Sequence, residues 1–374
     1  MLYREIREYV DSGVYPMHMP GHKRNAWFLP PGFACDVDIT EIHGFDDLYN
    51  SHGVLLETAE LAASLYGSAK AFLLVNGSTV GILAAIGAHT TRGDRILAAG
   101  NSHRSVFNAA KLFGLNLISL KPETDGISGI GRSIDPARVE SALEKVSGIK
   151  LVVVTSPSYE GVVSDISAIA HVAHERGIPL LVDSAHGAHL GFSPGFPDSA
   201  VRSGADVVVM SLHKTLPALT QSSLLHVCSN RANVDELARL LSALQTSSPS
   251  YMLMASIDNC LRLLSSSRDE LFCSYERNLA SFSEGIKDLK NLIVPYHSPN
   301  PLHPGFFAFD PGKIVIVTKN TALSGLMLAD ILRTEHKIEI ELANNDYAIA
   351  MTSICDSEGG FTRLAEALVK IDRT

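Results

Sequence analysis

The stretch Pro179-Leu180-Leu181-Val182-Asp183-Ser184-Ala185-His186-Gly187-Ala188-His189 joins an uninterrupted apolar run to a group of small and ionisable residues. Apolar residues that do not alternate with polar ones are typical of a short strand covered on both faces, as in parallel sheets. Asp183 closes this strand and is therefore predicted to lie buried at its carboxyl end. A buried carboxylate requires a cation or a hydrogen-bond donor beside it. The stretch thus predicts a fold class and the position of a site.

Similar apolar runs lie on both sides of this strand. The predicted strands are Ala71–Val75, Arg95–Ala98, Leu115–Leu120, Leu151–Thr155, Leu180–Asp183, Val207–Met210 and Leu224–Val227. Helical segments alternate with them and begin near Thr79, Ser102, Pro136, Asp165 and Asn233. Buried strands that alternate with helices indicate an α/β fold with a mainly parallel seven-stranded sheet between helices.

Changes in the sequence pattern divide the chain into three parts. Residues 1–50 are rich in proline and glycine and predict a short helix followed by an irregular arm. Residues 51–270 are expected to form the large domain, and residues 271–374 a small α+β domain. The remaining expected elements are a helix at 252–286, a loop with Pro299, Pro301 and Pro304, strands at 314–318 and 348–352, and helices at 324–333 and 361–369.

The composition excludes several classes of protein. The chain has 374 residues, of which 46% are hydrophobic and 19% charged, with a net charge of −9. This acidic balance argues against binding to nucleic acid or to anionic lipid. No apolar run approaches the roughly 18 residues that a membrane span needs. The five scattered cysteines are expected to be reduced thiols, so a cytoplasmic enzyme or binding protein remains.

Polar residues at the strand ends are candidates for a ligand site, because ligands of α/β proteins bind at the carboxyl ends of the strands. Asn76-Gly77-Ser78-Thr79 follows the first strand and precedes a helix. Small residues and hydroxyls at a helix start can bind a phosphate group. The alternative, in which Ser78 or Thr79 is only the N-cap of the helix, is equally compatible with this segment.

His103 and Lys214 follow two other strands. The ring of His103 could stack on a flat ligand, although taken alone it is more readily read as a surface histidine at a helix start. Lys214 ends a buried strand with no acidic residue within four positions, and a lysine in such a pocket loses its proton easily and can form a Schiff base. Taken alone, however, it is more readily read as a surface lysine.

Two interpretations compete for Asp183. With His186 and His189 it could bind a metal ion, or it could pair with the protonated ring nitrogen of a cofactor. A phosphate site, a stacking ring, a carboxylate and a nucleophilic lysine are together what pyridoxal 5′-phosphate requires. A metal site would leave Lys214 and the phosphate site unexplained. The sequence therefore predicts pyridoxal phosphate and no metal.

These segments resemble the Orn/Lys/Arg decarboxylase family of fold-type-I pyridoxal-phosphate enzymes, which are related to aspartate aminotransferase. The similar segments cover nearly the whole chain. They are His18-Met-Pro-Gly-His-Lys23, Gly44-Phe-Asp-Asp-Leu48, Leu74-Val-Asn-Gly-Ser-Thr-Val-Gly-Ile82, Asn101-Ser-His-Arg-Ser-Val106, Thr155-Ser-Pro-Ser-Tyr-Glu-Gly161, Asp183-Ser-Ala-His-Gly-Ala-His189, His213-Lys-Thr-Leu-Pro-Ala-Leu-Thr-Gln221 and Ser248-Pro-Ser-Tyr-Met-Leu-Met-Ala-Ser256.

The resemblance implies a role for each site residue. Lys214 would form the Schiff base, and Asp183 would keep the pyridine nitrogen protonated. His103 would stack on one face of the ring, with Ala185 against the other and His186 near the ring hydroxyl. The residues implied to bind the phosphate or line its pocket are Gly77, Ser78, Thr79, Ser211 and His213. The resemblance also implies a homodimer or larger homo-oligomer with a shared active site.

The expected reaction is decarboxylation of lysine, ornithine or arginine to the amine and CO₂, as in polyamine biosynthesis. An aminotransferase, a lyase, or a pyridoxal-phosphate-binding protein without turnover are the alternatives. The chain departs from the family at Ser184 and at Leu212. The sequence also ends at Thr374, whereas many relatives continue into a C-terminal domain, so we expect a short form of the family.

Two further observations concern the substrate. Aminotransferases usually hold the α-carboxylate with an arginine of the small domain. The arginines after residue 300 are Arg333, Arg363 and Arg373, and none directly follows the strand expected at 348–352, which favours decarboxylation. A distal ammonium or guanidinium group needs a carboxylate partner. The candidates are Glu41, Asp46, Asp47 and Glu160, each of which is equally compatible with a turn or a solvated face.

Overall fold

The computed structural model describes residues 1–30, 32–297 and 305–373. Within them, seven strands form one sheet in the order β1-β8-β7-β6-β4-β2-β3. The strands are β1 (Lys70–Leu74), β2 (Arg95–Ala99), β3 (Asn116–Leu120), β4 (Ile149–Thr155), β6 (Leu180–Asp183), β7 (Val207–Ser211) and β8 (Ser223–Val227). The seven strands expected from the apolar runs are thus confirmed, with ends that shift by at most two residues.

The sheet is mainly parallel, as predicted. β8 is antiparallel to its neighbours β1 and β7, whereas the other neighbouring pairs are parallel. Asp183 at the end of β6 lies opposite Thr155 of β4 and Val209 of β7. Because β8 is antiparallel to both β1 and β7, these two strands run in the same direction, and β1 ends at the same edge of the sheet as β7. The loops that follow these strands therefore lie close together, at the edge of the sheet where the strands end.

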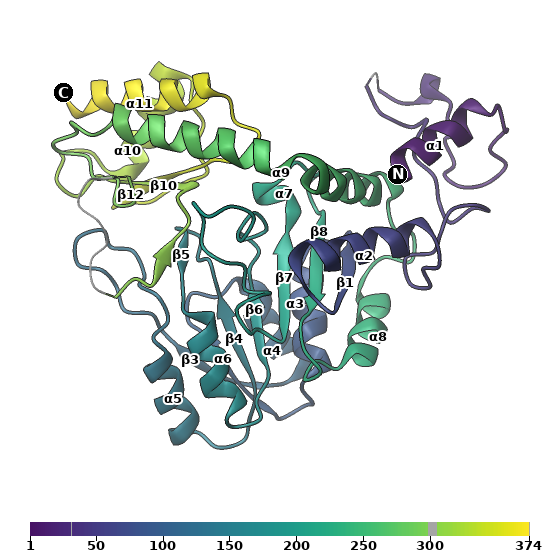
Figure 1. The fold of residues 1–374 in the computed structure, drawn as a ribbon, viewed down its shortest axis with the longest axis horizontal. Coiled ribbons are helices and arrows are strands. Elements are labelled where there is room, and N and C mark those ends of the chain that lie inside the picture. Colours follow the sequence, from purple (N-terminus) through teal and green to yellow (C-terminus); the bar gives the residue numbers. More distant parts are fainter. Residues whose placement is uncertain (31, 298–304, 374) are drawn as a thin grey trace.

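Helices cover both faces of this sheet (Figure 1). One apolar core lies under α3 (Gly77–Ala88), α4 (Arg104–Phe113) and α8 (Val234–Leu244). The larger core on the opposite face includes residues of α2 (Val54–Tyr66), α5 (Pro136–Lys145) and α6 (Ile166–His174). Burial on both faces explains why the strands carry almost only apolar residues.

The C-terminal part forms a second, smaller sheet in the order β10-β12-β11. Its elements are β10 (Lys313–Val317), α10 (Gly325–His336), β11 (Leu342–Ala343), β12 (Tyr347–Met351) and α11 (Glu358–Asp372). The two strands and two helices predicted here are confirmed. The proline-containing part of the expected loop, with Pro299, Pro301 and Pro304, lies outside the described residues. We propose the division into 1–50, 51–270 and 271–374 as the domain organisation.

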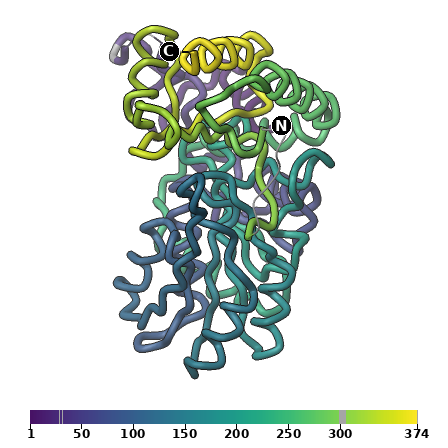
Figure 2. Tube along the Cα trace, turned by 90° about the vertical axis from the view of Figure 1, so that its left-hand side faces the viewer, coloured from purple at the N-terminus to yellow at the C-terminus, as the bar shows by residue number. Residues whose placement is uncertain are grey.

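Two features connect the large and small sheets. Helix α9 (Tyr251–Gly285) is continuous over 35 residues, and it contacts α1 and α2 at one end and α11 at the other. A short antiparallel pair joins β5 (Val162–Val163) to β9 (Ala308–Phe309). Figures 1 and 2 show the C-terminal elements at one end of the large sheet. The contacts described below show that this is the end where β6 and β7 finish.

The N-terminal arm begins with α1 (Leu2–Asp11), the short helix expected there. Leu2 and Ile6 are fully buried, and the helix packs on α9. The backbone N–H of Leu2 donates to the buried carboxylate of Asp258, which also accepts a hydrogen bond from Thr58 of α2. This carboxylate therefore ties the arm to the large domain.

Candidate active site

The residues predicted to bind phosphate lie at the N-terminus of α3. Asn76 is the N-cap, and its side chain makes no capping hydrogen bond, so it leaves the N–H groups of the first turn to other acceptors. Gly77 has a φ of +71°, and no atom lies within 4 Å of the place where a Cβ would stand. The alternative in which Ser78 or Thr79 is the N-cap is wrong, because Asn76 holds that position.

Hydroxyl groups from three elements meet beside this helix start. The Ser78 Oγ lies 2.7 Å from the Oγ of Ser211 at the end of β7, and it donates to the Ser223 Oγ of β8 at 3.3 Å. Thr79 is exposed at the same turn. A helix N-terminus, an unobstructed glycine and several hydroxyl donors suit a phosphate group. The residues present therefore fit the phosphate of pyridoxal phosphate.

Asp183 lies deeper, at the end of β6, and only 2% of it is exposed. Its Oδ1 accepts a hydrogen bond from the N–H of Ala185 at 3.1 Å. Burial raises the pKa of Asp183, and the nearby charges of Lys214 and His103 only partly oppose this effect. A protonated ring nitrogen would provide the cation that this buried carboxylate requires.

Lys214 lies on the short helix α7 (Leu212–Thr215), directly after β7. Its Nζ is 3.1 Å from the Nε2 of His186, which comes from the loop after β6. The neighbouring His213 is held by a hydrogen bond between its Nδ1 and the carbonyl oxygen of Ser222, 2.9 Å away. The segment after β6 and the segment after β7 therefore meet at the ends of these two adjacent strands.

Burial changes the acid–base character of Lys214. It lowers the pKa of the Lys214 amine, although the carboxylates of Asp183 and Glu341 oppose this change. A lower pKa leaves more of the amine unprotonated near neutral pH, and only the unprotonated form is a nucleophile. The interpretation of Lys214 as an ordinary surface lysine is therefore not supported.

His103 is the N-cap of α4, and its Nδ1 accepts a hydrogen bond from the N–H of Ser105. It also lies 2.9 Å from the Ser105 Oγ, so the ring is held in place although the residue is exposed. Burial lowers the pKa of His103, while the charge of Asp183 opposes this shift. Ala185 is buried on the loop after Asp183. The Ala185 N–H donates to Asp183, so Ala185 lies directly beside this carboxylate.

His186 has a second lysine neighbour that the sequence analysis missed. Its Nδ1 lies 2.8 Å from the Nζ of Lys313, the first residue of β10. The ring of Tyr159 packs against the His186 ring with centroids 4.7 Å apart. Burial and the charges of Lys313 and Lys214 hold the pKa of His186 well below its usual value. His186 is therefore a neutral imidazole between two amines.

The four proposed carboxylate partners of a distal amine differ in their surroundings. Asp46 accepts hydrogen bonds from the backbone of residues 52, 53 and 55, and Asp47 from that of Tyr49, which favours a turn role for both. Glu41 is exposed. Glu160 directly follows Tyr159, whose ring packs against His186, and it therefore lies beside the candidate site.

Glu160 accepts hydrogen bonds from Ser158 at 2.8 Å and from Tyr347 at 2.9 Å. A further carboxylate near it, Glu341, accepts a hydrogen bond from the Tyr159 hydroxyl. No local sequence pattern indicates Glu341, because it lies directly before β11 of the small sheet, far along the chain from Tyr159. Two carboxylates therefore lie on the small-sheet side of the site.

The metal interpretation has no structural support. His189 pairs with the buried Asp310 at 3.0 Å instead of joining Asp183. Among the described residues, no group of three or more His, Cys, Asp or Glu side chains could hold a metal ion. In the same part of the chain, no helix is both long enough and apolar enough to cross a membrane.

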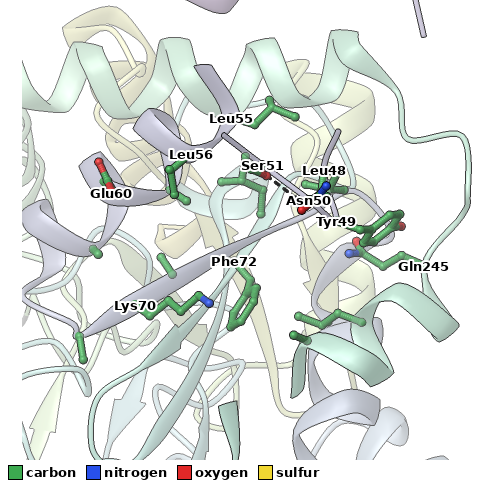
Figure 3. Close-up of a pocket in the computed structure, with 17 residues that line it drawn as sticks. Leu48, Tyr49, Asn50, Ser51, Leu55, Leu56, Glu60, Lys70, Phe72 and Gln245 are labelled. Carbon is green, nitrogen blue, oxygen red and sulfur yellow. Dashed lines mark hydrogen bonds between the residues drawn. The ribbon is translucent and has the colours of Figure 1, made fainter. Parts of the chain in front are cut away.

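A cavity of about 480 Å³ lies elsewhere, between β1, α2 and α8 (Figure 3). Its wall includes Lys70 and Phe72 of β1, Tyr49 of the loop before α2 and Gln245 after α8. The Gln245 Oε1 accepts the backbone N–H of Val75, so this side chain completes the end of β1. The cavity contains neither Lys214 nor Asp183 and is not the candidate active site.

The parallel sheet and the residues at its carboxyl edge define a fold-type-I pyridoxal-phosphate enzyme fold. A lysine decarboxylase from Francisella novicida superposes with a TM-score of 0.83 at 19% identity, covering 100% of this chain and 60% of that one. An alanine–glyoxylate aminotransferase from Nostoc gives a TM-score of 0.68 at 16% identity, covering 85% of this chain and 86% of that one. At such identities the likeness establishes the fold.

The family model of the Orn/Lys/Arg decarboxylase major domain matches residues 1–312, and the chain belongs to this family. The uncharacterized protein YaaO of Bacillus subtilis is 37% identical over 99% of this chain and 77% of its own length. An arginine decarboxylase of Bacillus cereus is 31% identical over 100% of this chain and 82% of its own length. The chain spans about 60% of the length of three lysine decarboxylases of known structure.

Proposed function

We propose that this chain is a pyridoxal-phosphate-dependent decarboxylase of a basic amino acid. The observation that carries the proposal is the grouping of Lys214, Asp183 and the Gly77–Thr79 turn at one edge of the sheet in a member of this family. When bound there, pyridoxal phosphate would supply an electron-accepting ring that stabilises the carbanion left by loss of CO₂.

The residues at the start of α3 would anchor the cofactor phosphate. Ser78 and Ser211 present hydroxyls, and the open backbone at Gly77 allows close approach. Asp183 would pair with the protonated ring nitrogen, so that its buried charge is balanced. His103 and Ala185 would flank the ring, with His186 and His213 beside it. Together with Thr79 of the same turn and Lys214, this set includes every site residue expected from the sequence.

Lys214 would bind the cofactor aldehyde and hold the proton that moves during the reaction. Its lowered pKa suits both tasks, because the amine can lose and regain a proton near neutral pH. Glu160 and Glu341 would bind the distal cation of the substrate. We choose arginine as the first substrate to test, because four relatives that are 30–32% identical to this chain are named arginine decarboxylases.

We further propose a homodimer or larger homo-oligomer with a shared site, acting in the cytoplasm and in polyamine biosynthesis. All five cysteines are unpaired, which supports a reducing compartment. An aminotransferase remains the second candidate because such an enzyme shares the fold. β12 ends at Met351 and is directly followed by Thr352 and Ser353, so no arginine stands at the end of this strand, where an aminotransferase would be expected to hold an α-carboxylate.

The test is release of ¹⁴CO₂ from carboxyl-labelled arginine, lysine and ornithine with pyridoxal phosphate present. We expect release from one substrate above the others, and none from Lys214→Ala. Formation of a keto acid without CO₂ would establish the aminotransferase instead. A wild-type chain that takes up the cofactor but yields neither product would contradict both enzymatic functions and leave a binding role.

A further inference from the structure

Two adjacent residues of the large domain exchange hydrogen bonds with two residues of the small sheet. The hydroxyl of Tyr159 donates to Glu341, which lies directly before β11. In the opposite direction, the hydroxyl of Tyr347 at the start of β12 donates to Glu160 at 2.9 Å. Each side of this contact thus supplies one tyrosine and one carboxylate. The proposed reaction gives a role to the carboxylates but none to the tyrosines.

A tight turn fixes the positions of Tyr159 and Glu160. The N–H of Gly161 donates to the carbonyl oxygen of Ser158 at 3.0 Å, so the two residues occupy the central positions of a β-turn. Gly161 has a φ of +91°, and a Cβ added to it would stand 2.7 Å from the Cβ of Lys313 in β10. The turn is therefore packed directly against the small sheet.

The Tyr159 side chain lies between the cofactor site and Glu341. Its ring packs against the ring of His186, whose Nε2 is 3.1 Å from the Nζ of Lys214, and its hydroxyl contacts Glu341. Burial lowers the pKa of Lys214, and the carboxylates of Asp183 and Glu341 oppose this change, so the charge of Glu341 acts at the nucleophile. An amino group bound near Lys214 and a cation bound by Glu341 could therefore belong to one substrate.

The two carboxylates differ in the acceptor sites that they leave open. Glu160 is half-buried, and its two oxygens accept hydrogen bonds from Tyr347 and from Ser158. Glu341 is exposed, and no described residue donates a hydrogen bond to its Oε2. A carboxylate that is fixed through one oxygen and open at the other suits a cation from outside the chain. Glu341 is therefore the better placed of the two to bind a substrate cation.

Tyrosine is a suitable residue to hold such a carboxylate. Burial raises the pKa of Tyr159, and the hydrogen bond to Glu341 raises it further, so the hydroxyl stays protonated and donates. A neutral donor orients the carboxylate and leaves its charge available. A lysine or arginine in the same place would instead pair with that charge and weaken its attraction for a substrate.

We propose that Tyr159 is a positioning residue for substrate recognition, which holds Glu341 beside the active site so that this carboxylate binds the distal cation of a basic amino acid. The proposal rests on the proposed decarboxylase function and names a residue that determines its substrate class. Tyr159 acts through Glu341. The bond from Tyr347 to Glu160 holds the turn that carries Tyr159 against the small sheet.

The first measurement is the affinity of the holoenzyme for agmatine and for butylamine, by isothermal titration calorimetry. Agmatine is butylamine with a guanidinium group at its distal end, so the difference between the two affinities reports the distal contact. Cadaverine and pentylamine are the corresponding pair for lysine.

Tyr159→Phe keeps the ring beside His186 and removes only the hydroxyl. It should weaken agmatine binding roughly tenfold and leave butylamine binding unchanged. Tyr49→Phe is the matched control, because Tyr49 is also half-buried and its hydroxyl donates to the distant Thr246. This control should change neither affinity. Equal diamine and agmatine affinities in the wild type and in Tyr159→Phe would overturn the proposal.

The second measurement separates a positioning role from a structural one. If Tyr159 acts through Glu341, its hydroxyl has no carboxylate to hold in Glu341→Ala. The double variant should therefore bind agmatine as weakly as Glu341→Ala alone. Effects that multiply in the double variant would contradict the proposal. A wild type that binds agmatine and cadaverine no more tightly than butylamine and pentylamine would overturn it even if Tyr159→Phe failed to fold.

The failure of this proposal can be told from the failure of the proposed function. CO₂ release from the wild type, together with equal agmatine affinities for the wild type and Tyr159→Phe, would refute the role of Tyr159 alone. A Tyr159-dependent affinity for agmatine without release of CO₂ from any basic amino acid would refute the decarboxylase function and retain the recognition of the distal cation.

Discussion

The hydroxyl oxygens of Ser78 and Ser211 lie 2.7 Å apart although the two residues are separated by 133 positions in the sequence. One starts α3 and the other ends β7, and the sheet brings them together because β8 lies between β1 and β7. The pair brings a hydroxyl of α3 and a hydroxyl of β7 to the phosphate site that we propose. It therefore offers a direct test of cofactor binding.

Replacing Ser211 with Ala should weaken pyridoxal-phosphate binding by roughly ten- to a hundredfold, because a hydrogen bond to a charged group contributes about 1.5–3 kcal/mol. Fluorescence titration with the cofactor measures this change. Ser266→Ala, at an exposed position of α9, is the control. Equal affinities for the wild type and Ser211→Ala would show that the phosphate is bound elsewhere.

Lys313 should make stability depend on pH in the alkaline range. The folded chain lowers its pKa from 10.5 to about 8, so the unfolded chain binds more protons between these values. Stability should therefore rise as the pH increases from 8 to 10.5, by at most about 3 kcal/mol from this group. Below pH 8 the full cost of the buried charge is present.

Urea unfolding of the wild type and Lys313→Met checks this expectation. Methionine carries no charge, so the variant should be more stable than the wild type at pH 7, and the difference should shrink toward pH 10. A difference that does not vary with pH would mean that Lys313 titrates normally in the folded chain.

Glu341→Gln should raise the KM for a basic amino acid more than it lowers kcat, because the carboxylate would contact the distal cation and not the reacting bond. Steady-state kinetics on the best substrate separates the two constants. Glu339→Gln, which changes an exposed carboxylate two residues away, should behave as the wild type. If both variants had the same KM, Glu160 would remain as the partner.

Asp258→Ala should destabilise the fold by about 3 kcal/mol, because it leaves buried donors without an acceptor. The carboxylate accepts hydrogen bonds from Leu2, Thr58 and Arg262, so its loss should also loosen α1. Urea unfolding and limited proteolysis of the arm measure these effects. Asp269→Ala, at an exposed position of the same helix, should change neither.

The sequence could predict the large sheet because its strands are buried on both faces and therefore appear as continuous apolar runs. Asp183 and Lys214 could be located for the same reason, since each directly follows such a run. The direction of the chain then determines that they share an edge. Such features can be predicted from neighbouring residues alone, without knowing which distant residues they contact.

Lys313 and Glu341 could not be predicted in this way. Lys313 precedes the apolar run of residues 314–317, where a lysine is normally an exposed flanking residue. Its partner His186 is 127 positions away, and nothing in either segment indicates the other. The hydrogen bonds that Asp46 accepts could not be predicted either, because they form only when the loop before α2 folds back onto the Asp46 carboxylate.

His186 touches one lysine from the large sheet and another from the small sheet. A hinge motion that separated the sheets by a few ångströms would break the contact with Lys313 and leave Lys214 beside Asp183. His186 would then keep only its partner from the large sheet. The contact of the three residues therefore requires the two sheets to be close together, and its loss would report that they had separated.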